Sequence, residues 1–247
     1  MTDQSSSLVD TRGIVPTWRD VARFAIRPRL PQEIGGISRG SLLATLKLYA
    51  LDMVLMGIAL LAFLAVEGAG IELPSNELES IDLGLGMIAF IVLLAPLGEE
   101  IAFRGWLSGR PGALGSIALL ALALLIGGQF QETLGAAGTG VAVIGCLILA
   151  LAVAFVFYER PAFGWFAWAF PLFFWLSTLG FAAIHLGNYA DTDEMLWPLV
   201  IPQFIAGILF AYARVHHGLW SSILLHLLHN GTFIVLVLAG EGLATGA

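Results

Sequence analysis

Charge is scarce in this sequence. Only 12% of the 247 residues are Asp, Glu, Lys or Arg, about half the share found in soluble domains. A water-soluble fold of this length could not cover its surface with so few charges, and a disordered chain would be richer in polar and charged residues. The net charge of -7 also argues against a nucleic-acid-binding protein, because such proteins carry basic patches.

Cysteine is scarcer still. The single Cys146 excludes an internal disulfide, and it lies in an apolar run without neighbouring metal-ligand residues. Hydrophobic residues, in contrast, make up 58% of the chain. The class that fits these proportions is a polytopic membrane protein.

Long apolar runs occupy most of the chain. A helix needs about 20 mostly apolar residues to cross about 30 Å of hydrocarbon. We therefore predict an all-α transmembrane bundle of about seven spans over residues 41–247, preceded by a cytoplasmic segment at 1–40. The predicted spans are 43–65, 84–107, 113–129, 137–158, 164–186, 196–214 and 218–239.

The segment at 1–40 is polar and basic, and the apolar run after it is too long for a signal peptide. Four apolar residues in it share one helical face, and arginines occupy the other faces. The apolar residues are Trp18, Val21, Phe24 and Ala25, and the arginines are Arg19, Arg23 and Arg27. This pattern is typical of an amphipathic helix on an anionic membrane surface. A loosely ordered basic tail is the alternative.

The basic residues predict the orientation. With seven spans, every Lys and Arg falls on one side of the membrane, and the loops of the opposite side carry acids. The basic residues are Arg12, Arg19, Arg23, Arg27, Arg29, Arg39, Lys47, Arg104, Arg110, Arg160 and Arg214; the acids are Glu67, Glu72, Glu77, Glu79, Asp82, Glu132, Asp191, Asp193 and Glu194. Because Lys and Arg favour cytoplasmic loops, we expect a cytoplasmic N-terminus and a C-terminus on the far side.

Three charged residues lie within the second span, where charges are costly and usually functional. Glu100 and Arg104 are four residues apart and can pair along one helix face. Glu99 is rotated by about 100° from Glu100. It is therefore left as a lone carboxylate in a low-dielectric environment, which suits a general base. A structural Glu–Arg pair near the helix end is the alternative.

Two later spans carry histidines. His185 follows Phe181 by one helical turn, and His226 and Asn230 share one face of the last span, with His229 as a neighbour. Each histidine alone is more typical of an interhelical hydrogen bond. Combined with a free carboxylate, they supply a water-activating base and donors for an oxyanion. Counting residues along the fifth span places His185 nearer the membrane face opposite to that of Glu99 and His226. One shared site therefore requires tilted helices or a longer fifth span.

Two further polar residues receive structural interpretations. Asp52 in the first span is expected to make a structural polar contact, and Gln203 in the sixth span to bond across helices.

The three motifs, in this order, resemble those of the CPBP intramembrane proteases. This family groups type II CAAX prenyl endopeptidases with bacterial bacteriocin-processing and immunity (Abi) proteins. The motifs read Glu-Glu-x-x-x-Arg from Glu99, Phe-x-x-x-His from Phe181 and His-x-x-x-Asn from His226, and the resemblance covers roughly 84–232. Some eighty residues separate the first motif from the second, which is more than the family pattern has. Residues 113–158 therefore resemble an inserted helical pair.

The resemblance implies hydrolysis of a peptide bond in a membrane-anchored or membrane-delivered substrate, within a bacterial inner (cytoplasmic) membrane. The partners are then this substrate and the lipid bilayer, with no nucleic acid. The roles carried over by motif are water activation by Glu99 and His185, oxyanion stabilisation by His226 and Asn230, and support of the site's geometry by Glu100 and Arg104.

Proteins of this family have often been called metalloproteases. Zinc requires three protein ligands and an open position, which His185, His226 and Glu99 would supply. The sequence has no His-Glu-x-x-His helix, however, and Asn230 is a poor zinc ligand. We therefore expect a metal-free glutamate mechanism without a cofactor, with zinc as the alternative.

Two other functions are compatible with these residues. The chain can be a non-proteolytic scaffold or immunity protein that has kept the fold. It can also be a proton-linked transporter, because buried Glu and His residues also relay protons.

Overall fold

The computed structural model describes residues 13–76, 81–189 and 197–245, and it is almost entirely helical. Within these ranges, seven helical segments are long and apolar enough to cross a membrane, and each overlaps a predicted span. They are Arg39–Gly68, Leu85–Ser108, Pro111–Gln129, Gln131–Val156, Gly164–Asn188, Trp197–His217 and Leu219–Gly240. The described part of the chain contains one isolated β-bridge, between Asn76 and Tyr189, and no strand. The predicted all-α integral membrane fold is therefore confirmed.

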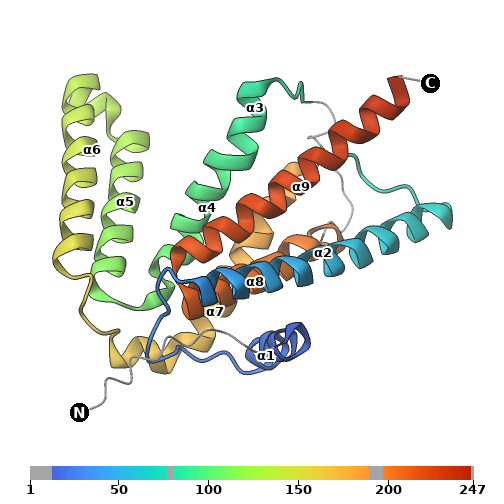
Figure 1. Cartoon of the computed structure of the whole chain (residues 1–247). Helices are drawn as coiled ribbons and strands as arrows, with labels where there is room; N and C mark the ends of the chain where they lie inside the picture. Colours follow the sequence, from blue (N-terminus) through green and yellow to red (C-terminus); the bar gives the residue numbers. More distant parts are fainter. Residues whose placement is uncertain (1–12, 77–80, 190–196, 246–247) are drawn as a thin grey trace, which may run out of the picture.

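Helix α8 (Ile201–His217) is the most buried of these spans and forms the centre of the bundle. It packs against α2 (Arg39–Gly68), α4 (Ala95–Arg104), α7 (Gly164–Ile184) and α9 (Leu219–Thr245) (Figure 1). The outer helices keep exposed apolar faces, as expected where lipid replaces water. This arrangement brings the second, fifth and last predicted spans around α8.

The second span consists of several helical pieces. Helix α3 (Leu85–Ala89) passes through the π-helical segment η2 (Phe90–Leu94) into α4, which ends in the 3-10 turn η3 (Gly105–Ser108). In η2 the N–H of Ala95 bonds to the carbonyl of Phe90, five residues before it. The next bond in this register would come from Pro96, which has no N–H. The helix therefore returns to α geometry immediately before the Glu-Glu motif.

Helices α5 (Pro111–Gln129) and α6 (Gln131–Val156) form a hairpin that stands to one side of the bundle (Figure 1). The two helices pack along each other, and Ser116 Oγ donates to the carbonyl of Ala150 at 2.8 Å. Turn η3 contacts the hairpin, and Arg110 donates to the carbonyl of Tyr158 across its base. The pair at 113–158 is thus one structural unit, while its origin as an insertion stays a prediction.

Helix α1 (Ile14–Ile26) shows that the basic segment is not a loose tail at these residues. The Phe24 ring packs edge-on against Phe174 and Tyr212, with centroids 5.2 and 5.3 Å apart. Trp18 Nε1 donates to the carbonyl of Lys47 at 2.9 Å. The apolar face that the sequence suggested would contact lipid is therefore covered by α2, α7 and α8.

Part of the predicted charge separation lies outside the described residues, as does residue 196 of the predicted sixth span. The residues concerned are Arg12, Glu77, Glu79, Asp191, Asp193 and Glu194. The orientation of the termini stays a prediction.

Replacing Phe24 by Ala tests whether α1 is part of the packed fold. We expect the free energy of unfolding in detergent to fall by about 3–5 kcal/mol, because a buried aromatic ring is lost. Ile26→Ala is the matched control, since Ile26 lies on the same helix with 77% of its surface exposed and its removal should cost under about 0.5 kcal/mol. Equal effects of the two substitutions would contradict the docking of α1.

Candidate active site

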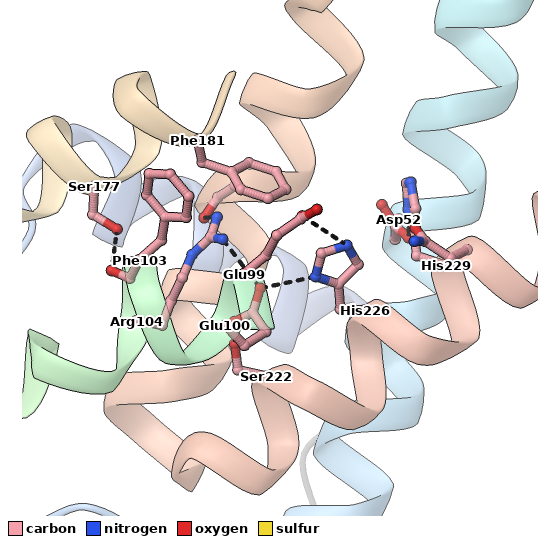
Figure 2. A network of polar contacts seen from close by, with 12 residues as sticks. Asp52, Glu99, Glu100, Phe103, Arg104, Ser177, Phe181, Ser222, His226 and His229 are labelled. Atoms are coloured by element: carbon pink, nitrogen blue, oxygen red, sulfur yellow. Dashed lines mark hydrogen bonds and ion pairs between the residues drawn. The ribbon is translucent and has the colours of Figure 1, made fainter. Parts of the chain in front are cut away.

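A buried carboxylate joins α4 to α9. Glu100 and Arg104 are both fully buried, and Arg104 Nη1 lies 3.1 Å from Glu100 Oε1, so the predicted pair is present. His226 Nδ1 lies 3.0 Å from the same oxygen. Ser222, one turn before His226 on α9, donates to the other oxygen, Oε2. Both oxygens of Glu100 are therefore satisfied, and the side chain is held by two helices (Figure 2).

The Arg104 guanidinium is enclosed by α7 and α8. Its central carbon lies 4.0 Å from the centroid of the Phe181 ring, a cation–π contact that strengthens away from water. Arg104 Nη2 donates to the carbonyl of Gly207 at 3.4 Å. A Cβ atom at Gly207 would come within 3.2 Å of this nitrogen. Glycine at this position thus lets α8 approach the ion pair.

Arg214, near the end of α8, fixes the end of α4. Its Nε donates to the carbonyl of Arg104 at 2.8 Å, and Nη2 donates to the carbonyl of Gly105 at 3.0 Å. The last carbonyls of a helix lack partners within the helix, so Arg214 supplies donors for two of them. From the sequence, Arg214 was predicted only to indicate orientation, and this capping role was not predicted because it depends on a contact between two helices.

Glu99 is the free carboxylate. Its side chain is 26% exposed, and 3.7 Å separates Glu99 Oε2 from Nε2 of His226. This distance exceeds that of a hydrogen bond, and Glu99 Oε2 is buried without a hydrogen-bond partner in the described part of the chain. The two glutamates therefore face the two nitrogens of one imidazole ring, Glu100 at Nδ1 and Glu99 at Nε2 (Figure 2).

The His226 ring is held rigidly. It stacks on Phe210 with centroids 4.4 Å apart, and Phe181 packs edge-on against it at 5.7 Å. A carboxylate at Nδ1 favours the tautomer that carries its hydrogen there. The neutral ring then presents the lone pair of Nε2 toward Glu99, and Nε2 becomes a donor only when the ring is protonated.

His185 lies one turn beyond these contacts, at the start of the 3-10 turn η4 (His185–Asn188). Its Nδ1 is 2.7 Å from the carbonyl of Phe181, and its ring packs against the Phe181 ring at 4.7 Å. Phe181 also contacts Arg104 and His226. The fifth span therefore reaches the depth of the Glu-Glu motif, although no hydrogen bond joins His185 to Glu99 within the described ranges.

Asn230 holds the irregular turn of the second span. Its Nδ2 donates to the carbonyl of Ile91 at 2.8 Å. In the five-residue register of η2, the partner of this carbonyl would be Pro96, which has no N–H to give. Asn230 satisfies the carbonyl instead and keeps a second amide hydrogen for another acceptor.

A second polar pair lies farther along α9. His229 Nδ1 is 2.7 Å from Asp52 Oδ2 on α2, and Asp52 is fully buried. The two residues are 177 positions apart in the sequence, so their pairing could not be predicted from local spacing. Gln203 Oε1 is buried without a hydrogen-bond partner among the described residues, so the bond across helices expected of it is not seen at this oxygen.

The zinc alternative depends on His185, His226 and Glu99. His226 contacts Glu100 and His185 contacts the carbonyl of Phe181, in both cases through Nδ1, which leaves Nε2 of each ring as the nitrogen that could bind a water or a metal. Over the described ranges, no three His, Cys, Asp or Glu side chains are grouped in a way that could hold a metal.

Fold and site together define an all-helical integral membrane protein with a buried acid–base cluster. The model of the Rce1-like family, described as type II CAAX prenyl endopeptidase Rce1-like, matches residues 81–232, more than half of the chain. The chain belongs to this family, and the resemblance drawn from the three motifs is confirmed. No curated protein and no solved structure matches the chain.

The ion pair at the centre of the site predicts strong coupling between its members. Arg104→Met leaves Glu100 as an uncompensated buried charge and should lower the free energy of unfolding by about 3–5 kcal/mol. Adding Glu100→Gln removes that charge, so the double variant should be more stable than Arg104→Met alone. Denaturation of both variants and of Glu100→Gln in detergent measures this coupling. Additive losses would contradict it.

Proposed function

We propose that this protein is an intramembrane endopeptidase that hydrolyses a peptide bond with a glutamate-activated water. Membership of the CAAX prenyl endopeptidase family supports the reaction class. The observation that carries the mechanism is the position of Glu99, whose Oε2 has no hydrogen-bond partner within the described residues and faces His226 Nε2 across 3.7 Å.

A water molecule that binds beside Glu99 and His226 would be within reach of both. The Glu99 carboxylate accepts a proton from this water as its oxygen attacks the carbonyl carbon of the scissile peptide bond. His226 Nε2 orients the water, because its lone pair accepts the second hydrogen. The fixed ring of His226 costs little reorganisation when the reaction begins.

Glu100, Arg104 and Ser222 act on the reaction through His226. They fix the ring. Because the Glu100 carboxylate is already paired, it does not compete with Glu99 for the water. His185 and Asn230 lie one turn from the cluster, and Asn230 has a spare amide hydrogen for the developing oxyanion. In this scheme His226, and not His185, is the histidine next to Glu99, which differs from the division of roles that the family resemblance implied.

The substrate that fits this site is a peptide held at the membrane, because the reacting groups lie within membrane-spanning helices. The distribution of Lys and Arg over the sequence supports a cytoplasmic N-terminus and a C-terminus on the opposite side. We place the protein in a bacterial inner membrane, with its substrates membrane-anchored or delivered from the membrane surface.

The decisive variant is Glu99→Gln. It removes the base but keeps the size of the side chain, so cleavage of fluorogenic, lipid-anchored peptides in liposomes should fall by about 10²–10⁴-fold. The matched control is Glu67→Gln, at an exposed position near the end of α2, which should cleave like the wild type. Equal cleavage by both variants would remove Glu99 from the mechanism. Inactive wild-type protein across a broad peptide panel would favour a scaffold or immunity role.

We further propose that the reaction needs no metal, because the described side chains form no zinc site. Prolonged treatment with 1,10-phenanthroline should leave the cleavage rate within about twofold of the untreated rate, since general base catalysis by Glu99 needs only water. Elemental analysis of the active protein should show no stoichiometric zinc. Loss of activity that added zinc restores would contradict this proposal.

A further inference from the structure

Asp52 and His229 form a second acid–base pair beside the proposed catalytic one. Asp52 Oδ2 accepts from His229 Nδ1 at 2.7 Å, while Asp52 Oδ1 is buried without a partner among the described residues. The mechanism proposed above uses neither residue. A fully buried carboxylate inside a membrane helix is costly and usually functional.

A donor role for this pair requires the protonated form of His229, in which the ring and Asp52 form an ion pair. Within the described ranges, the ion pair to His229 is the single one that Asp52 makes. Burying an uncompensated carboxylate costs several kcal/mol, and a protonated His229 supplies the counter-charge. In that form Nδ1–H binds Asp52, and Nε2 carries a second hydrogen that can be given away.

The position of His229 matches a role in the same reaction. It lies one turn after His226 on α9, with ring centroids 6.3 Å apart, and both rings contact Phe210. The His229 side chain is 16% exposed, against 3% for His226. Figure 2 shows the Asp52–His229 pair on the side of His226 opposite Arg104. A peptide bond held at Glu99 and His226 would have His229 one helical turn away on α9.

We propose, resting on the endopeptidase function above, that His229 is the proton donor to the leaving amine and that Asp52 is its positioning residue. After attack, Glu99 holds the proton taken from water, and the tetrahedral intermediate carries the negative oxygen. As the carbon–nitrogen bond breaks, its electron pair goes to nitrogen, which takes the proton from His229 Nε2. The products are a carboxylic acid and an amine, and the proton on Glu99 returns to His229 through solvent.

This role predicts a dependence on the leaving group. An anilide nitrogen leaves only after it has gained a proton, whereas a phenoxide leaves without one. The probes are two lipid-anchored peptides of identical sequence, one a C-terminal anilide and one the phenyl ester. His229→Gln should lower anilide cleavage by about 10²–10⁴-fold while phenyl ester cleavage stays close to that of the wild type. The ratio of the two rates does not depend on the fraction of folded protein.

Asp52→Asn gives a second test, since it should lower the same ratio even if His229→Gln does not fold. Tyr49→Phe is the matched control, because Tyr49 bonds Thr232 at 2.5 Å between the same two helices, one turn away, and has no role in proton transfer. Its ratio should equal that of the wild type.

The outcomes separate this inference from the function on which it rests. If Glu99→Gln loses both activities while His229→Gln and Asp52→Asn keep the wild-type ratio, the endopeptidase function holds and His229 is not the donor. If the wild type cleaves neither probe, the endopeptidase function fails and this role fails with it. A ratio lowered in both variants and unchanged in Tyr49→Phe establishes the donor.

Discussion

The binding of the Glu100 carboxylate is the interaction on which the rest of the site depends. A carboxylate without solvent contact in a membrane protein must be paired, and Arg104, Ser222 and His226 supply the partners from α4 and α9. The same contacts join the two helices and fix one nitrogen of the His226 ring. Because Nδ1 is occupied by Glu100, Nε2 is the ring nitrogen that faces Glu99. One structural carboxylate thereby orients the imidazole that faces the free carboxylate of Glu99.

The backbone carbonyls around the site also find hydrogen-bond partners. Pro96 has no N–H to donate within the second span, and the carbonyl of Ile91 accepts from Asn230 instead. The carbonyls at the end of α4 bind Arg214 from α8. Hydrocarbon offers no water to unpaired carbonyls, so an irregular helix in the membrane requires side chains from its neighbours. Asn230 and Arg214 therefore hold the Glu-Glu motif at its place along α8 and α9.

Helix α9 carries two histidines whose Nδ1 atoms each face a buried carboxylate on another helix. His226 faces Glu100 on α4, and His229 faces Asp52 on α2. Phe210 of α8 lies against both rings. This repetition places two oriented imidazoles side by side, and one of them faces the free carboxylate of Glu99. Hydrolysis of an amide needs a base for the water and an acid for the amine, and the two pairs match these requirements.

The sequence by itself determined the seven spans and the Glu100–Arg104 pair, because hydrophobic length and the four-residue spacing are local properties of a helix. It also determined the family, through the order of three short motifs. Only the tertiary structure decided that Glu99 faces His226, that Ser222 binds Glu100 and that Asp52 binds His229. It likewise decided that α1 packs on the bundle through Phe24. These contacts join residues from different helices, and their distances depend on how the helices tilt and pack, which helical periodicity does not encode.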